Sequence, residues 1–155
     1  MANADFLEAV ARIADELRDA QLNSELEALL NERFPPGGEQ FARLSALCAK
    51  GEAEGWLMGR EAGGIKFGRA VKPGNEAGRF SVDVVRMKNV VGPHHVHTAG
   101  EIGAIMPISG NPQFDGKPGG WYVYPPGSSH RPTVTGGDAY VLYLLPGGAI
   151  EFTDK

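Results

Sequence analysis

The chain has 155 residues, of which 42% are hydrophobic and 22% charged, and its formal net charge is −4. This length is enough for one domain with a buried core and too short for a comfortable second domain. The acidic balance, without any run rich in lysine or arginine, argues against nucleic acid or an anionic membrane as a partner.

The N-terminal part, residues 1–51, is predicted to be a helical segment that packs on the rest of the chain. Asp5 with Glu8 resembles a capping box for a first helix, Ser24 and Glu27 begin a second, and a third ends near Gly51. Cys48, the single cysteine, lies on a predicted helix face and is interpreted as a small core residue. Three apolar series at helical spacing carry the prediction: Phe6, Val10, Ile13 and Leu17; Leu26, Leu29 and Leu30; Phe41, Leu44, Leu47 and Cys48.

The remainder, residues 52–155, is rich in glycine and proline and predicts short β-strands joined by tight turns. Four Gly-Gly pairs are interpreted as hairpin turns between these strands. Many short strands of this kind indicate a sandwich or a closed barrel. The strands are expected at residues 56–59, 65–71, 80–87, 95–97, 101–108, 121–124 and 139–145, with 149–152 as a possible eighth.

All four histidines lie in two short segments, and three of them form a candidate metal site. His95, His97 and Glu101 are spaced H-x-H-x-x-x-E, and His130 ends a P-x-G-x-x-H segment. Residues i and i+2 of a strand share a face, so both histidines of the first segment can point into a barrel. Three imidazoles and a carboxylate suit a divalent metal such as Zn, Fe, Mn or Ni and leave positions open for substrate. The alternative is a hydrogen-bonded histidine pair without a metal.

These two segments resemble the two motifs of the cupin superfamily. Gly110 closes the first motif, while Gly119, Pro125 and Gly127 fall in register on the second, which departs from the family only at Val134, where the motif has Asn. The resemblance implies a mainly β fold, the cupin double-stranded β-helix or jelly-roll barrel, preceded here by the helical segment. On a regular strand His94 faces away from His95, so we interpret it as a residue of the pocket rim or behind the ligands, and as a catalytic candidate beside Glu101.

More than half of the chain resembles a narrower family, the 4-hydroxylaminobenzoate lyases. The most specific part is the run from Gly120 to Val134, and a departure stands at Thr98 and Ala99, where the family has Pro-Asn. The resemblance implies conversion of 4-hydroxylaminobenzoate to 3,4-dihydroxybenzoate and ammonia, with Glu101 as metal ligand, proton carrier or purely structural residue. The other matching runs are Phe80–Val85, Gly92–His94, Gly100–Ile102, Phe114–Gly116 and Leu142–Phe152.

A small aromatic substrate of this type needs an apolar slot for its ring and a cation for its carboxylate. Tyr122 and Tyr124 share one face of a predicted strand and Trp121 takes the other, so one of these faces is expected to line the barrel; core packing is the alternative. Arg86 is favoured as the cation because it interrupts an apolar strand. The other candidate cations are Lys66, Arg69 and Arg131.

Two further functions remain open from the sequence. One is an Fe- or Ni-dependent cupin dioxygenase acting on a small thiol or aromatic substrate, which consumes O₂. The other is a non-catalytic cupin that binds a small molecule. In each case we expect a cytoplasmic homodimer, since no apolar run reaches membrane-spanning length and the helical segment offers a surface for pairing.

Overall fold

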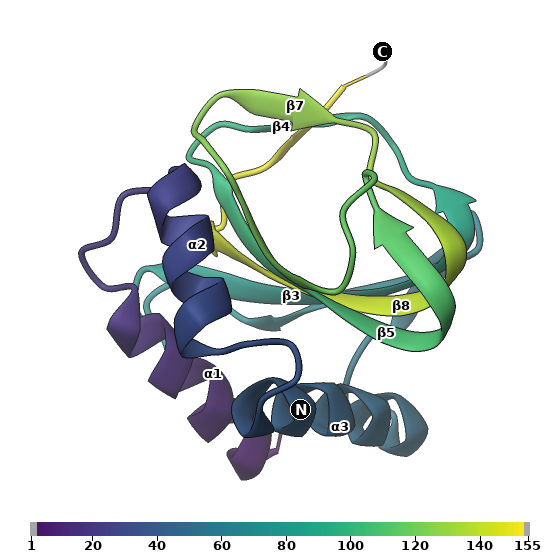
Figure 1. The fold of residues 1–155 in the computed structure, drawn as a ribbon, viewed down its shortest axis with the longest axis horizontal. Helices are drawn as coiled ribbons and strands as arrows, with labels where there is room; N and C mark the ends of the chain where they lie inside the picture. The colour runs from purple at the N-terminus through teal and green to yellow at the C-terminus, as the bar shows by residue number, and fades with distance from the viewer. Residues whose placement is uncertain (1–2, 154–155) are drawn as a thin grey trace.

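The computed structural model describes residues 3–153 and consists of a β-barrel with three helices on one side (Figure 1). The helices α1 (Ala4–Glu16), α2 (Ser24–Arg33) and α3 (Glu39–Glu54) all precede the strands. No helix among the described residues is long and apolar enough to cross a membrane. The helices pack against the outer face of the larger sheet, so the predicted helical segment is present and extends three residues past Gly51.

The two sheets are antiparallel throughout and together form the cupin jelly-roll barrel predicted from the sequence motifs. The larger has the order β1-β2-β3-β8-β5-β6, and the smaller has the order β7-β4-β9. Figure 1 shows β4 and β7 crossing above the curved sheet that contains β3, β8 and β5. The strands are β1 (Arg60–Ala62), β2 (Ile65–Val71), β3 (Phe80–Val91), β4 (His95–His97), β5 (Glu101–Phe114), β6 (Gly120–Tyr124), β7 (Ser128–His130), β8 (Thr133–Pro146) and β9 (Glu151–Phe152).

Asparagine side chains begin the first two helices. The Asn3 side chain accepts a hydrogen bond from the Phe6 backbone N–H at 2.8 Å, and Asn23 accepts one from Leu26 at 3.0 Å. Each satisfies a backbone donor that has no partner within its helix. The capping box expected at Asp5 and Glu8 is therefore wrong, because the chain becomes helical one residue before Asp5.

The third helix continues for three residues past Gly51, near which the sequence predicted its end. A Cβ atom at this position would lie 2.5 Å from the Leu57 side chain and 2.9 Å from Trp56, so the glycine allows the following segment to fold back onto the helix. The helix ends instead at Gly55, which adopts a left-handed conformation with φ of 82°.

The predicted strands differ from the structure in several places, and β1 was not predicted. Residues 56–59 form no strand, because Trp56 packs on Phe6 at the helix side, with ring centroids 5.7 Å apart. Strand β7 was missed, because its Ser-Ser-His sequence has no apolar alternation. Several strands are longer than predicted, since β-bulges let pairing continue past Lys88 in β3 and Pro107 in β5. One Gly-Gly pair expected as a turn, residues 136–137, lies inside β8.

Alternation along the strands gives the larger sheet two different faces. The face toward the helices holds most of the core, including the buried side chains of Val82, Val84 and Leu142. The face toward the barrel interior holds a smaller cluster that includes Met87, Tyr122 and Val141. Consecutive residues of one strand thus belong to two separate packing regions, and the barrel interior is the side that contains the histidine segments.

Candidate functional site

Two short strands, β4 and β7, and the start of β5 bring the four predicted ligands together. Strand β4 pairs with β7 so that His95 lies opposite His130, and His97 lies two residues further along β4 on the same face. Glu101 is the first residue of β5, four residues after His97, across a turn in which Gly100 has φ of 90°. One ligand atom from each of these residues lies within 4.8 Å of every other.

The three imidazoles face one another through their Nε2 atoms. His97 Nε2 lies 2.9 Å from His95 Nε2, 3.0 Å from His130 Nε2 and 3.2 Å from Glu101 Oε1. Two nitrogens bound at right angles to one ion at the usual Zn–N length are roughly 3 Å apart. The spacing of the donor atoms therefore suits a single divalent ion.

Hydrogen bonds on the far side of two rings assign their tautomers. His95 Nδ1 lies 3.2 Å from the Pro93 carbonyl oxygen, and His130 Nδ1 lies 2.6 Å from Asp115 Oδ2. Both acceptors require a proton on Nδ1, which leaves the Nε2 lone pairs of His95 and His130 directed at the centre of the cluster. A metal ion at this centre would accept these lone pairs together with that of His97, so the residues present fit a metal ion.

Burial keeps His95 and His97 neutral. It lowers the pKa of His95 to about 4 and that of His97 to about 3, with the neighbouring imidazoles acting in the same direction. Burial also raises the pKa of Glu101, to about 8. Neutral imidazoles are the form that binds metals.

The buried oxygen atoms without a geometrically complete hydrogen bond include Glu101 Oε2 and the Tyr122 hydroxyl, which lie near each other beside the cluster. The Tyr122 ring lies directly over Gly103, where a Cβ atom would come within 2.1 Å of it. Burial, followed by the nearby Glu101 carboxylate, raises the pKa of the Tyr122 phenol. Buried polar groups are normally satisfied, so these two atoms are available to a bound molecule.

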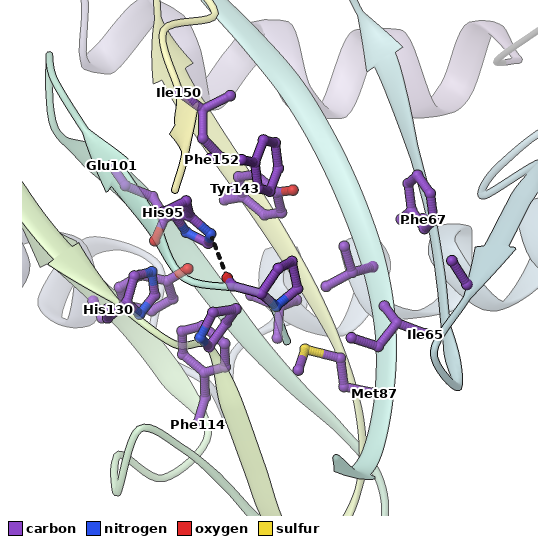
Figure 2. A pocket seen from close by; sticks show the side chains of 16 residues that line it. Ile65, Phe67, Met87, His95, Glu101, Phe114, His130, Tyr143, Ile150 and Phe152 are labelled. Carbon is purple, nitrogen blue, oxygen red and sulfur yellow. Dashed lines mark hydrogen bonds between the residues drawn. The ribbon is translucent and has the colours of Figure 1, made fainter. Parts of the chain in front are cut away.

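A cavity of about 220 Å³ begins at the cluster and extends through the barrel interior (Figure 2). His95, Glu101 and His130 form part of its wall, together with Tyr122 and Tyr143. The remaining lining side chains are apolar and come from both sheets and the loops between them. They are Ala62, Ile65, Phe67, Val85, Met87, Pro93, Phe114, Pro132, Val141, Ile150 and Phe152.

Sequence reasoning gave no role to Asp115, which supports the cluster from behind. Its Oδ2 accepts hydrogen bonds from the His130 ring and, at 2.7 Å, from the Tyr124 hydroxyl, while Oδ1 accepts one from the Thr133 backbone at 3.0 Å. The residue lies in a turn with φ of 52°, a conformation that Asp tolerates better than most residues. Its turn was noticed only as part of the Phe114–Gly116 run.

His94 points away from the other histidines, as strand alternation predicts. Its Nδ1 contacts the hydroxyl of Thr153, and its carbonyl accepts the Thr153 backbone N–H at 3.0 Å. His94 is absent from the cavity wall. Its interactions attach the C-terminal strand to β4 and give no support to the catalytic role suggested from the sequence.

Two predicted substrate residues lie on the other face of the sheet. Arg86 binds Asp138 of the neighbouring strand β8 through Nη2 and Glu52 of α3 through Nη1, each at 2.7 Å. The Trp121 indole donates to the Phe34 carbonyl oxygen at 2.9 Å and packs among the helices. The guanidinium of Arg86 thus already has two carboxylate partners and lies outside the cavity wall, so the structure does not support its predicted contact with a substrate carboxylate, and Trp121 is a core residue. Of the three predicted aromatic residues, only Tyr122 lines the cavity.

Comparison with known proteins identifies relatives of this chain. The chain is 31% identical over 157 residues to a 4-hydroxylaminobenzoate lyase of Nocardioides sp. (strain LMS-CY), with 96% of this chain and 93% of that protein covered. It is 29% identical over 153 residues to a 4-hydroxylaminobenzoate lyase of Pseudomonas putida, with 88% and 87% covered. Both alignments extend over the helical segment as well as the barrel.

A solved structure shares the fold at low sequence identity. The crystal structure of the DMSP lyase DddQ from Ruegeria pomeroyi DSS-3 superposes with a TM-score of 0.53 at 17% identity, over 94% of this chain and 76% of that one. The family profile described as PnbB, 4-hydroxylaminobenzoate lyase, matches residues 8–152. The chain therefore belongs to the 4-hydroxylaminobenzoate lyase family.

Proposed function

We propose that this cupin lyase converts 4-hydroxylaminobenzoate to 3,4-dihydroxybenzoate and ammonia, with a divalent metal bound by His95, His97, Glu101 and His130. The observation that carries the proposal is the convergence of these four side chains at one end of an apolar cavity. Membership of the family supports the choice of substrate.

The overall reaction needs water but no external oxidant. The N–O bond breaks and its oxygen leaves as water, while one water oxygen bonds to the ring carbon beside the nitrogen and a second replaces the nitrogen, which leaves as ammonia. The ring loses the two electrons that reduce the N–O bond. One water is consumed overall, and neither O₂ nor a redox cofactor enters the balance.

The chain's own residues would orient the reacting group and move its protons. A bound divalent metal would supply Lewis acidity for cleavage of the N–O bond. The Nδ1 hydrogen bonds of His95 and His130 fix the directions of these rings. Glu101 Oε2 and the Tyr122 hydroxyl, both buried and without a geometrically complete hydrogen bond, are the groups that would exchange protons with the departing oxygen and the incoming water.

The apolar wall would hold the aromatic ring and exclude bulk water. Phe67 and Phe114 contribute aromatic surface, while Val85, Met87 and Val141 contribute aliphatic surface. Exclusion of water strengthens the electrostatic interactions at the polar end and limits uncontrolled hydrolysis of the reactive hydroxylamine.

An anaerobic assay tests the proposal. Purified protein loaded separately with Zn, Fe, Mn or Ni is mixed with 4-hydroxylaminobenzoate under argon, and ammonia and 3,4-dihydroxybenzoate are quantified. We expect equal amounts of both products with at least one metal. A requirement for O₂ would instead indicate a dioxygenase, and tight binding without product would indicate a binding protein; either result contradicts the proposal.

A further inference from the structure

One row of residues crosses the interior face of the larger sheet, from the site to β2. The pairing register places Arg69 of β2 opposite Asp83 of β3, and Asp83 opposite Tyr143 of β8. Tyr143 lies opposite Gly103 of β5, and Gly103 lies opposite Tyr122 of β6. Both tyrosines line the cavity. The row therefore has Tyr122 of the site at one end and a cation at the other.

The guanidinium of Arg69 is held in place, and one side of it remains open. Its Nε donates to Asp83 Oδ1 at 2.9 Å, and its Nη2 donates to the Gly148 carbonyl oxygen at 3.2 Å. Asp83 is buried, and its other oxygen accepts a hydrogen bond from the Ser81 hydroxyl at 2.9 Å. A Cβ atom at Gly148 would lie 2.8 Å from Arg69 Nη1, so the glycine leaves room for the guanidinium. Within the described residues Nη1 donates no hydrogen bond, so it is available to an anion.

Arg69 differs in its position from the other cations considered from the sequence. Lys66 and Arg86 bind a carboxylate of α3 on the helix side of the sheet. Arg131 is exposed in the loop after β7. Arg69 instead shares the interior face with Phe67, which lies two residues earlier on β2 and lines the cavity.

The length of the row suits a ring with substituents at its opposite ends. Asp83, which binds the guanidinium, is two strands away from Gly103, roughly 10 Å at the usual spacing of neighbouring strands. The hydroxylamine and the carboxylate of 4-hydroxylaminobenzoate stand at opposite ends of its ring, at a comparable separation. Figure 2 shows Phe67 across the cavity from Glu101 and His130. A ring bound between them would have its hydroxylamine at the cluster and its carboxylate toward the guanidinium.

The charges along the row are compatible with an anionic ring. Burial, followed by the charges of Asp83 and Glu101, raises the pKa of the Tyr143 phenol, so this hydroxyl stays protonated and can donate a hydrogen bond. The side chain of Arg69 is partly exposed, so a carboxylate beside it keeps part of its hydration. At the other end of the row, the divalent ion of the proposed function would offset the charge of Glu101.

We propose that Arg69 binds the ring carboxylate of the substrate, with the Tyr143 hydroxyl as a second donor. This inference rests on the proposed function and names the residues that select a carboxylated ring. The planar guanidinium donates to a carboxylate with charge-assisted hydrogen bonds, which a neutral substituent at the same ring position cannot accept.

Calorimetry with two unreactive analogues tests the assignment. Metal-loaded protein is titrated with 4-aminobenzoate or 4-methylaniline, which differ at one substituent, and the wild type is expected to bind 4-aminobenzoate more tightly. Arg69→Met should weaken binding of 4-aminobenzoate by about tenfold or more and leave that of 4-methylaniline within about twofold, because only the carboxylate loses a charged partner. Arg86→Met, the same substitution on the helix face, is the matched control and should alter neither affinity by more than about twofold.

Two further variants keep the test decisive. Arg69→Met leaves the buried Asp83 without its cation, so the double variant Arg69→Met/Asp83→Asn, in which both charges are removed, is titrated as well and should show the same loss. Tyr143→Phe should weaken binding of 4-aminobenzoate by about three- to tenfold, the effect of one hydrogen bond.

The titrations separate this inference from the lyase reaction. If the double variant is folded by circular dichroism and keeps the wild-type preference for 4-aminobenzoate, the inference is overturned. Wild-type protein that binds 4-methylaniline at least as tightly as 4-aminobenzoate overturns it as well. Failure of the wild type to release ammonia from 4-hydroxylaminobenzoate would contradict the proposed reaction, whereas the affinities would still decide the role of Arg69.

Discussion

The two faces of the six-stranded sheet are made from alternate residues of the same strands, yet one face forms the packed core and the other lines the cavity. Toward the helices, Val82, Val84 and Leu142 belong to a dry aliphatic core. Toward the barrel interior, Val85, Tyr122 and Tyr143 line a cavity next to the cluster of three histidines and Glu101. Adjacent residues of one strand therefore contribute to different properties, one to the stability of the core and the next to the cavity. Substitutions on the two faces should therefore have separable effects.

The largest effect is expected for His97→Ala on the cavity face. The variant loses the ligand that lies closest to the other three, so metal content should fall to background and kcat/KM by about a thousandfold, because several kcal/mol of charge stabilisation are lost with the ion. Elemental analysis and an ammonia assay measure both quantities. Far-UV circular dichroism should match the wild type, and a stoichiometric metal in this variant would refute the assigned ligand set.

The matched change on the helix face is Leu142→Ala. Leu142 is fully buried in the helix-side core, and truncation of such a residue typically costs about 2–5 kcal/mol. Urea unfolding of the metal-free protein should show this loss of stability, while metal affinity at 20 °C stays near that of the wild type. If the variant remained as stable as the wild type, the helix-side face would not be the main core.

An intermediate effect is expected behind the cluster, at Asp115→Asn. The variant loses the charge that holds the proton on His130 Nδ1, and loss of such a supporting group typically weakens metal binding by about 10–100-fold. Calorimetric titration with Zn²⁺ measures this directly. Tyr124→Phe is the control, since it removes the other hydrogen bond to the same Oδ2 and should change the affinity much less. Equal affinities of Asp115→Asn and wild type would indicate that Asp115 only maintains the turn and does not support metal binding.

The smallest effect on activity is expected for Arg86→Met. The side chain lies on the helix face, so kcat/KM should stay within about twofold of the wild type. Stability should fall by about 1–3 kcal/mol, because Asp138 and Glu52 lose their charged partner. Steady-state kinetics and urea unfolding give the two values. A large fall in kcat/KM with unchanged stability would indicate that Arg86 contacts the substrate after all.

The sequence predicted well those elements that follow a regular pattern of neighbouring residues. Helical spacing located all three helices, and the resemblance of the two histidine segments to the cupin motifs was enough to predict that His95, His97, Glu101 and His130 converge. Irregular features were harder, because they depend on distant contacts. The role of Gly51 depends on Leu57 and Trp56, and the extent of β3 and β5 depends on bulges that no local pattern reveals.

The errors at the site have one physical origin. Each depends on an interaction partner that lies far away along the chain. An arginine within an apolar strand implies a buried anion, and this reasoning holds for Arg86; the anions are Asp138 and Glu52, 52 and 34 residues away along the chain. Asp115 was missed for the same reason, since its importance comes from His130 in another strand. Alternation correctly separated Trp121 from Tyr122 but did not indicate which face was inside.

The central claim is that three imidazoles and one carboxylate on the cavity face bind a single metal ion. Anomalous diffraction from a crystal of the metal-loaded protein tests it most directly. The account predicts one peak per chain, about 2.0–2.2 Å from the Nε2 atoms of His95, His97 and His130 and from an oxygen of Glu101. A peak elsewhere, or none in protein saturated with metal, would contradict it.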